Sequence, residues 1–303
     1  MSQFNLEILD EYLKKSIVHE FKVQSVNDSN IKLFVKRDDL IHSEFSGNKL
    51  RKLKYNLKSC FDNQCEGILT FGGAFSNHLL AVASACNLLN LKSVGVVRGE
   101  ELNKYSNGLI SRCAALGMEL LFVTRYEYFS RKRATGKIDF RGSSFWSVPE
   151  GGANFEGIIG SREIVSNLDF DYVVLAQGTS TTSLGIALNL KDRQKIIVVP
   201  VLKGFDALGE MKNLLGDDKK FSEVQHKIIV LDDFHFGGYA KGTNELNLFI
   251  DEFNSFNNFR IEPVYTGKAM YALKEYIESN KFIENKKVLF VHTGGLNNYS
   301  DKI

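Results

Sequence analysis

The segment GILTFGGAFSNHLLAVASACNLL, residues 67–89, contains the pattern that decides the fold of this 303-residue chain. Residues 68–71 are mostly apolar and predict a buried strand, and residues 72–77 are rich in small and polar residues and predict a turn. The alanine-rich run that follows predicts a helix. A strand, a polar turn and a helix in this order are the unit of α/β folds with parallel strands, so we expect that class.

The same unit recurs on both sides of this segment. The sequence predicts further strands in SVGVVRGE (93–100), at 120–123, at 173–176, in KIIVVP (195–200) and in KVLFV (287–291). Gly117 is expected as the C-terminal cap of the helix that precedes the strand at 120–123. Two series of strands and helices meet near residue 150 and predict two α/β lobes, with any ligand at the carboxyl ends of the strands.

Composition limits the classes of partner. The formal net charge is +2 and the hydrophobic content is 44%, so no overall electrostatic attraction favours nucleic acid or an anionic membrane, and we expect neither as a partner. The N-terminal residues show no signal-peptide pattern and no apolar run is long enough to cross a bilayer, so a cytoplasmic location is expected. Cysteines 60, 65, 86 and 113 lack metal-ligand spacing, so we expect no metal and no disulfide framework.

The segment AQGTSTTSLG, residues 176–185, places a polar turn between a strand and a helix. Gly178 permits close backbone approach, the hydroxyls of residues 179–182 can donate hydrogen bonds, and a helix N-terminus attracts anions. The turn lacks the lysine of a Walker loop and the glycine spacing of a dinucleotide site. A phosphate cradle and an ordinary capped turn remain equally supported by this segment alone.

The segment GGAFSNHLLA, residues 72–81, offers a second candidate. Ser76, Asn77 and the nearby amides could hold a carboxylate, and Asn77 could bind an aromatic oxygen. Serine and asparagine are also the favoured N-cap residues without any ligand, and by itself this segment favours that alternative.

The segment SGNKLRKLKYNL, residues 46–57, predicts an amphipathic helix after an N-cap at Ser46, with Leu50, Leu53 and Leu57 as its buried stripe. Lys49 and Lys54 border this stripe, and we expect Arg51, Lys52 and Lys58 on a solvated cationic face. A lysine in the first helical turn opposes the helix dipole, and partial burial also favours its neutral form. Lys49 is therefore a candidate nucleophile toward an aldehyde.

Three later segments combine glycine with hydroxyl-bearing residues: DDFHFGGYAKG, EPVYTGKAM and FVHTGGL. No spacing rule makes Tyr239, Tyr265, Thr266 or Thr293 catalytic, since buried tyrosines are more often core residues. We expect His292 to be structural, because no metal-ligand pattern accompanies it.

Taken in order, KRDDL, GNKLRKL, GGAFSNH, PEGG, GTSTT, PVYTGK and HTGG cover nearly the whole chain. In this order and spacing they resemble the pyridoxal-phosphate enzymes of the tryptophan-synthase-β-like fold (fold type II), in the group that contains 1-aminocyclopropane-1-carboxylate deaminase and D-cysteine desulfhydrase. The resemblance implies two open, twisted α/β domains. It places a large cofactor-binding domain at 1–51 plus 156–303 and a small domain at 52–155.

The resemblance also implies roles for the candidate residues. Lys49 would bond covalently to the pyridoxal phosphate aldehyde and later move protons at the substrate α-carbon, and Asn77 would contact the phenolic oxygen of the cofactor. Ser76 and His78, with Asn77 and nearby amides, would receive the substrate carboxylate, while Tyr239 and Tyr265 would face the substrate as acid/base or positioning groups. Thr266 and Thr293 would lie near the pyridine nitrogen. The phosphate would be held by Gly178, Thr179, Ser180, Thr181 and Thr182.

Departures from the family pattern bear on the reaction. Thr266 stands where the cyclopropane deaminases have a glutamate, as it does in D-cysteine desulfhydrases, and a hydroxyl supports the electron sink less than a carboxylate. We therefore expect a lyase that converts D-cysteine to pyruvate, sulfide and ammonia. The alternatives are a 1-aminocyclopropane-1-carboxylate deaminase giving 2-oxobutanoate and ammonia, or a protein that binds the cofactor or an amino acid without turnover.

Three further departures leave the details of the site open. Phe75 replaces the usual glutamine, Leu80 occupies a commonly basic position, and Ser180 replaces a usual glycine of the phosphate loop. Phe75 and Leu80 are the reason for keeping the third alternative. A homodimer is expected from the resemblance alone, and the sequence does not decide the stereochemistry of the substrate.

Overall fold

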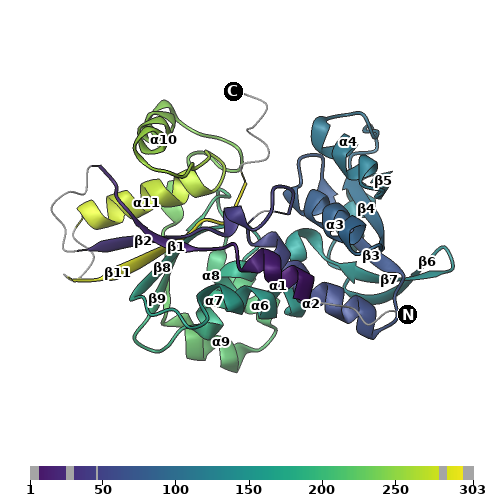
Figure 1. Cartoon of the computed structure of the whole chain (residues 1–303), viewed down its shortest axis with the longest axis horizontal. Helices are drawn as coiled ribbons and strands as arrows, with labels where there is room; N and C mark the ends of the chain where they lie inside the picture. Colours follow the sequence, from purple (N-terminus) through teal and green to yellow (C-terminus); the bar gives the residue numbers. More distant parts are fainter. Residues whose placement is uncertain (1–6, 25–30, 46, 280–284, 296–303) are drawn as a thin grey trace.

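The computed structural model describes residues 7–24, 31–45, 47–279 and 285–295. It contains two β-sheets side by side, and each sheet has helices on both faces (Figure 1). This arrangement confirms the expected α/β class with two lobes. Within the described residues, no helix is both long enough and apolar enough to cross a membrane.

The larger sheet has six strands in the order β1-β2-β11-β8-β9-β10. All neighbouring pairs are parallel except β1 and β2. The strand β11 lies between β2 and β8, so Val288 is in register with both Leu33 and Tyr172. The strands are β1 (Val18–Phe21), β2 (Lys32–Lys36), β8 (Tyr172–Gln177), β9 (Lys195–Pro200), β10 (Ile228–Val230) and β11 (Lys287–Val291).

The smaller sheet has five strands in the order β5-β4-β3-β7-β6, and only β6 and β7 are antiparallel. The expected strands at 68–71 and 120–123 lie within β3 and β5, and Gly117 follows helix α4 (Gly108–Ala115) with a left-handed φ of 86°. The strands are β3 (Gly67–Gly73), β4 (Lys92–Arg98), β5 (Glu119–Val123), β6 (Gly136–Phe140) and β7 (Ser143–Val148).

Helices cover the two faces of each sheet (Figure 1). In the larger sheet α10 and α11 cover one face and α6 to α9 the other; in the smaller sheet α2, α3 and α4 lie on one face and α5 on the other. The helices are α1 (Glu7–Leu13), α2 (Lys49–Asp62), α3 (Asn77–Leu88), α4 (Gly108–Ala115), α5 (Arg125–Arg131), α6 (Phe155–Arg162), α7 (Thr181–Asn189), α8 (Ala207–Leu215), α9 (Asp218–Gln225), α10 (Asn244–Phe256) and α11 (Thr266–Glu278).

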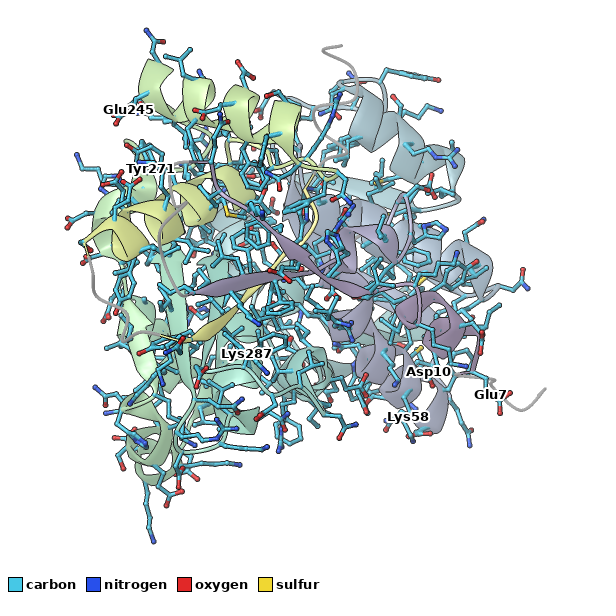
Figure 2. All side chains as sticks on the ribbon, turned by 60° about the vertical axis from the view of Figure 1, so that its left-hand side comes forward. Glu7, Asp10, Lys58, Glu245, Tyr271 and Lys287 are labelled. Atoms are coloured by element: carbon cyan, nitrogen blue, oxygen red, sulfur yellow. The ribbon has the colours of Figure 1, made fainter. Side chains whose placement is uncertain are left out.

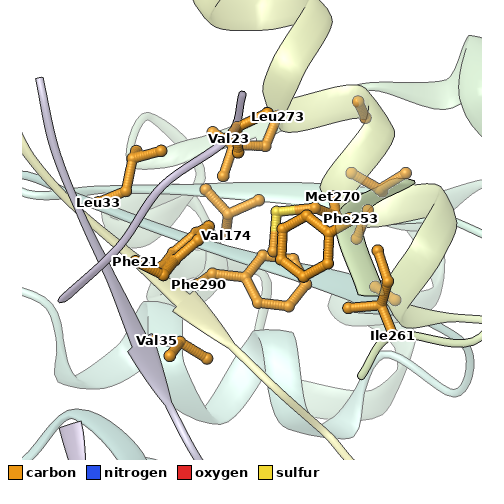
Figure 3. Close-up of a cluster of buried hydrophobic side chains, with 14 of the residues drawn as sticks. Phe21, Val23, Leu33, Val35, Val174, Phe253, Ile261, Met270, Leu273 and Phe290 are labelled. Atoms are coloured by element: carbon orange, nitrogen blue, oxygen red, sulfur yellow. The ribbon is translucent and has the colours of Figure 1, made fainter. Parts of the chain in front are cut away.

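The central strands of the larger sheet are buried on both faces, as parallel strands between two helical layers must be. On β8, Val174 packs into the cluster under α10 and α11 (Figure 3), whereas Val173 and Leu175 pack against α6 to α9. This is why the apolar run at 173–176 is continuous rather than alternating.

Helix α2 follows β2 of the larger sheet in the chain and packs its leucines into the core of the smaller sheet. Its other side meets α6 at very short range, because a Cβ added to Gly160 would lie 1.8 Å from the backbone oxygen of Arg51. Glycine thus lets α6 approach the backbone of α2. The domain limits expected above, 1–51 plus 156–303 and 52–155, stay a prediction.

Candidate active site

Lys49 is the first residue of α2, and Asn48 occupies the N-cap position. The helix therefore begins later than the expected start after Ser46, a residue that lies outside the described part of the chain. The position of Lys49 in the first turn is confirmed. So is the apolar stripe, because Leu50, Leu53 and Leu57 are at most 1% exposed.

The amine of Lys49 is poised between its charged and neutral forms. Burial lowers its pKa to about 8, while the negative charge of Glu262 opposes this change. The Lys49 Nζ donates a hydrogen bond to the Asn48 Oδ1 over 2.9 Å. A substantial fraction of neutral amine near pH 8 is what a nucleophilic lysine requires, so the expected direction of the pKa shift is confirmed.

Asn48 joins this amine to the polar turn after β8. Its Nδ2 donates to the Thr182 Oγ1 at 2.6 Å, while its Oδ1 accepts from Lys49. One amide side chain thus fixes the distance between the candidate nucleophile and the 178–182 turn. Sequence reasoning missed this function of Asn48, and its only signal was an amide directly before the lysine.

Arg51 does not lie on a solvated face, so that prediction was wrong. It is 4% exposed and forms a two-pronged ion pair with Asp38, with bonds of 2.6 and 2.7 Å. Burial alone would raise the pKa of Asp38, but the charge and hydrogen bonds of Arg51 lower it overall. Arg51 is buried because the 3₁₀ turn Asp38–Leu40 covers this side of α2 and supplies the compensating charge.

Lys52 is also buried, at 4% exposure, which corrects the second assignment to a solvated face. Its Nζ lies 3.1 Å from the Gly151 carbonyl oxygen and 3.4 Å from the Thr179 Oγ1. Burial, and then the nearby charge of Lys49, lower its pKa well below the usual lysine value. Lys52 is therefore a desolvated amine aimed at the polar turn, whereas Lys58 projects into solvent as expected (Figure 2).

The turn at 178–182 connects β8 to the N-terminus of α7. Ser180 has a left-handed φ of 60°, a conformation that glycine adopts more easily, and its Oγ accepts a 2.8 Å bond from the Gln177 Nε2. The first-turn amides of α7 have no intrahelical partner and carry the positive end of its dipole. Together with Lys52 and the hydroxyls of the turn, they can bind a phosphate dianion.

Two buried acceptors lie in the first turn of α3, which follows the central strand β3 of the smaller sheet. The Asn77 Oδ1 and the His78 Nδ1 have no hydrogen-bond partner among the described residues. The Thr70 hydroxyl donates to the Val148 oxygen at 2.8 Å, so we assign the 2.9 Å contact of Thr70 with His78 to donation from the His78 Nε2–H. Burial, followed by the charges of Lys52 and Lys49, lowers the pKa of His78 to about 3 and keeps the ring neutral.

His78 lies close to the lysine side of the site. A Cβ added to Gly152 would be 3.2 Å from the Lys52 Cβ and 3.6 Å from the His78 Cε1. Ser76 is the N-cap of α3, and its Oγ accepts from the Leu79 N–H at 3.4 Å, so the capping alternative holds for Ser76. The substrate-carboxylate roles of Ser76, Asn77 and His78 stay a prediction.

The two candidate tyrosines contact each other edge to face, with ring centroids 5.9 Å apart. Tyr265 also borders the polar turn, because a Cβ added to Gly178 would lie 3.5 Å from its Cε1. Burial, and then the neighbouring Tyr239, raise the pKa of Tyr265 well above the usual tyrosine value, so its phenol remains a proton donor. Tyr239 is 48% exposed and stands on the open side of the pair.

Lys268 anchors the segment that precedes Tyr239. This fully buried lysine donates to the His235 oxygen at 2.8 Å and to the Gly238 oxygen at 2.7 Å. The sequence offered no indication of this function, because a lysine in the helical segment TGKAM would ordinarily be exposed.

Thr266 and Thr293 lie in the part of the site that comes from the larger sheet. Thr266 begins α11 and exchanges hydrogen bonds with Glu262, a buried carboxylate that sequence reasoning also missed. The backbone oxygen of Thr293 accepts the Asn48 N–H at 3.4 Å, and His292 binds the Arg260 oxygen at 2.6 Å, a structural role as expected. The loop after β11 is thereby placed beside the first turn of α2.

The structure thus brings most of the predicted residues to one region between the two sheets. Hydrogen bonds join Lys49 to the polar turn through Asn48, and Lys52 to the same turn directly. A phosphorylated aldehyde fits the donor set here. The aldehyde would meet the Lys49 amine, whose pKa is lowered, and the phosphate would meet a helix N-terminus with a buried lysine. The two unpartnered acceptors on α3 could each accept a hydrogen bond from a bound ligand.

Comparison with known proteins finds relatives that cover most of the chain. The family model described as "Pyridoxal-phosphate dependent enzyme" matches residues 21–294. The bifunctional D-cysteine desulfhydrase/1-aminocyclopropane-1-carboxylate deaminase of Arabidopsis thaliana, a mitochondrial protein, is 31% identical over 296 residues, which cover 89% of this chain and 74% of the relative. A D-cysteine desulfhydrase of Yersinia pestis (strain Pestoides F) is 27% identical over 284 residues, covering 87% of this chain and 86% of that protein.

Among solved structures, one titled as an ACC deaminase homologue superposes with a TM-score of 0.75 at 25% sequence identity. The superposition covers 97% of each chain. The two-lobed arrangement of sheets is therefore shared over essentially the whole length.

Proposed function

Since the chain belongs to the family of pyridoxal-phosphate dependent enzymes, we propose that it is a lyase that removes the β-substituent of a small amino acid, with D-cysteine as the favoured substrate. The observation that carries the proposal is Lys49. Its amine has a pKa lowered to about 8 and is joined through Asn48 to the Thr182 hydroxyl of the anion-binding turn.

When bound, the cofactor would supply an electron sink. This sink would accept the electron pair that remains on the substrate α-carbon after the α-proton is removed. Residues 178–182 and Lys52 would hold its phosphate, and Asn77 would face its phenolic oxygen. Thr266 and Thr293 would border its pyridine nitrogen. The ordering of these groups by α2, α7 and α11 would bring the aldehyde to Lys49.

Lys49, once released as a free amine, would take the α-proton of the substrate. Tyr265 remains protonated because of its raised pKa, so it can donate a proton to the departing sulfur, with Tyr239 beside it. The released aminoacrylate then reacts with water. One D-cysteine and one water give one pyruvate, one hydrogen sulfide and one ammonia.

The second candidate reaction is the opening of 1-aminocyclopropane-1-carboxylate to 2-oxobutanoate and ammonia. It is supported by the name of the Arabidopsis relative, which includes both activities. Thr266 disfavours it, because a hydroxyl near the ring nitrogen deepens the sink less than a carboxylate would. Cleavage of a carbon–sulfur bond demands less of the sink, since thiolate is a good leaving group.

Two measurements test the proposal. The purified protein supplied with pyridoxal phosphate should develop the visible absorbance of a covalent link to lysine, and Lys49→Ala should abolish it, whereas the exposed Lys58→Ala should not. A panel of D-cysteine, L-cysteine, D-serine and 1-aminocyclopropane-1-carboxylate should yield sulfide and pyruvate from D-cysteine. If the wild type develops no such absorbance, the assignment of the site is wrong.

The panel also separates the alternatives. Formation of 2-oxobutanoate from the cyclopropane substrate would overturn the inference from Thr266 alone. If the lysine-linked absorbance develops but no substrate gives product, the protein binds the cofactor without turnover. The departures at Phe75 and Leu80 are the reason for this alternative.

We further propose a cytoplasmic homodimer. The four cysteines are buried free thiols, as is usual in a reducing compartment, and the dimer is expected from the family resemblance. Light scattering coupled to gel filtration would test the dimer, and fractionation of cells would test the location.

A further inference from the structure

Glu262 is a carboxylate buried at the start of α11, with only 2% of its surface exposed. Its Oε2 accepts the Val264 N–H at 2.7 Å, and its Oε1 accepts the N–H groups of Tyr265 and Thr266 at 2.9 and 2.8 Å. Burial raises the pKa of Glu262, and these three amides oppose the rise by stabilising the anion. They also lie at the positive end of the α11 dipole, which favours a carboxylate there.

The hydroxyl of Thr266 is committed to this carboxylate. It donates its one hydrogen to the Glu262 Oε1 at 3.2 Å, and it accepts the Glu262 backbone N–H at 2.9 Å. A hydroxyl has one hydrogen and two lone pairs. Thr266 therefore has one lone pair left and can act toward a ligand only as an acceptor while Glu262 holds its hydrogen.

Other groups of the site surround the same carboxylate. A Cβ added to Gly295 would lie 3.2 Å from the Glu262 Oε1, so the loop after β11 closes over it. The negative charge of Glu262 raises the pKa of both Lys49 and Lys268 against the larger effect of burial. The charge of Glu262, which stands four residues before the first residue of α11, thus acts on the nucleophilic lysine.

We propose that Glu262, acting through Thr266, keeps the pyridine nitrogen of the cofactor protonated. The inference rests on the proposed function, because it takes Thr266 to border that nitrogen. A protonated nitrogen donates to the free lone pair of Thr266, whereas an unprotonated nitrogen would require Thr266 to withdraw its hydrogen from a buried anion. The proton comes from water as the cofactor binds. Glu262 is a positioning residue, since it reaches the cofactor only through Thr266.

A protonated nitrogen makes the electron sink deeper than Thr266 alone would make it. The pair of Glu262 and Thr266 would then replace the single carboxylate of the cyclopropane deaminases. The enzyme could then act on amino acids whose leaving groups are poorer than thiolate. It could also open the ring of 1-aminocyclopropane-1-carboxylate.

The test is the ¹⁵N resonance of cofactor labelled at the ring nitrogen and bound to the protein. The wild type should resonate at the position of the protonated free cofactor. Glu262→Gln, which keeps the shape of the side chain and removes its charge, should shift the resonance to the unprotonated reference. Glu245→Gln removes an exposed carboxylate at the outer end of α10 (Figure 2) and should leave the resonance unchanged.

A second pair of variants decides the matter if Glu262→Gln does not fold. Thr266→Ser keeps the hydroxyl and should keep the protonated resonance, whereas Thr266→Val should lose it, with circular dichroism as the check on folding. A folded Glu262→Gln or Thr266→Val protein with the wild-type resonance would overturn the inference and leave the cofactor assignment intact. Failure of the wild type to develop the lysine-linked absorbance would overturn both.

Discussion

Replacing Lys52 by methionine tests the anion-binding turn most directly, because the two proteins differ by one buried amine. The Lys52 Nζ is 3.1 Å from the Gly151 oxygen and 3.4 Å from the Thr179 Oγ1, so it can still direct a hydrogen at a bound phosphate. A hydrogen bond to a charged group contributes about 1.5–3 kcal/mol. With about tenfold in affinity for each 1.4 kcal/mol, the Kd for pyridoxal phosphate should rise roughly 10- to 100-fold.

When no anion is bound, Lys52 should destabilise the folded protein. Its pKa is lowered well below the usual value by burial and by Lys49, so the unfolded chain binds the proton more tightly. The contribution of Lys52 to stability should therefore rise with pH between its lowered folded-state pKa and the ordinary lysine pKa, about 10.4, and Lys52→Met should remove this contribution. Inorganic phosphate should raise the melting temperature of the wild type much more than that of the variant.

Lys58→Met is the matched control for both measurements. Lys58 lies on the same helix, is exposed, and pairs only with Asp62 among the contacts that the structure describes. Its replacement should change the cofactor Kd less than about twofold, since exposed pairs contribute at most about 1 kcal/mol to stability and this one is remote from the turn. Equal Kd values for the wild type and Lys52→Met, measured by fluorescence titration, would refute the assignment of Lys52 to the phosphate.

Three further outcomes follow from the packing and charges of the site. Gly160→Ala places a Cβ 1.8 Å from the Arg51 oxygen and should lower the free energy of unfolding by about 1–3 kcal/mol or more in urea, whereas Gly108→Ala, with nothing within 4 Å, should not. Asp38→Asn leaves Arg51 buried without its partner and should cost about 3–5 kcal/mol at pH 7. Because the pKa of Asp38 is lowered on folding, this contribution is present above the unfolded value and disappears as pH falls through the folded one, so the two proteins should converge in strong acid. The rate at which the apoprotein bonds to pyridoxal phosphate should increase with pH around a midpoint of about 8, the pKa of Lys49, and a midpoint near 10 would contradict the burial of this amine.

Much of the fold was predictable because its signals are local. Apolar runs such as 173–176 identify strands buried on both faces, and Leu50, Leu53 and Leu57 identify the stripe that α2 turns toward the smaller sheet. Lys49 stood out for two local reasons, the helix start and the adjoining stripe. Its lowered pKa confirms that burial beside the stripe acts in the expected direction.

The other side of α2 was not predictable from the same signals. The spacing of apolar residues along a helix predicts which side is buried in an apolar core. The same pattern predicts that every charged residue on the opposite side is exposed to solvent. Arg51 and Lys52 are buried by partners distant in the chain: Asp38 lies 13 residues away, Gly151 lies 99 and Thr179 lies 127. Each buried charge of this kind is stabilised by its own specific partner. It can be predicted from the sequence only when that partner is already known.

The same limitation applies to the choice of reaction. When Thr266 alone is compared with the glutamate of the cyclopropane deaminases, it predicts a weaker electron sink in the cofactor. That comparison favours a substrate with a thiolate leaving group. Glu262 stands four residues earlier and is part of the same hydrogen-bonded unit, since Thr266 both accepts from its N–H and donates to its carboxylate. A hydroxyl whose hydrogen is held by a buried anion is a stronger acceptor than a free one. The electronic effect on the ring therefore depends on the pair, and the outcome with the cyclopropane substrate measures Glu262 as much as Thr266.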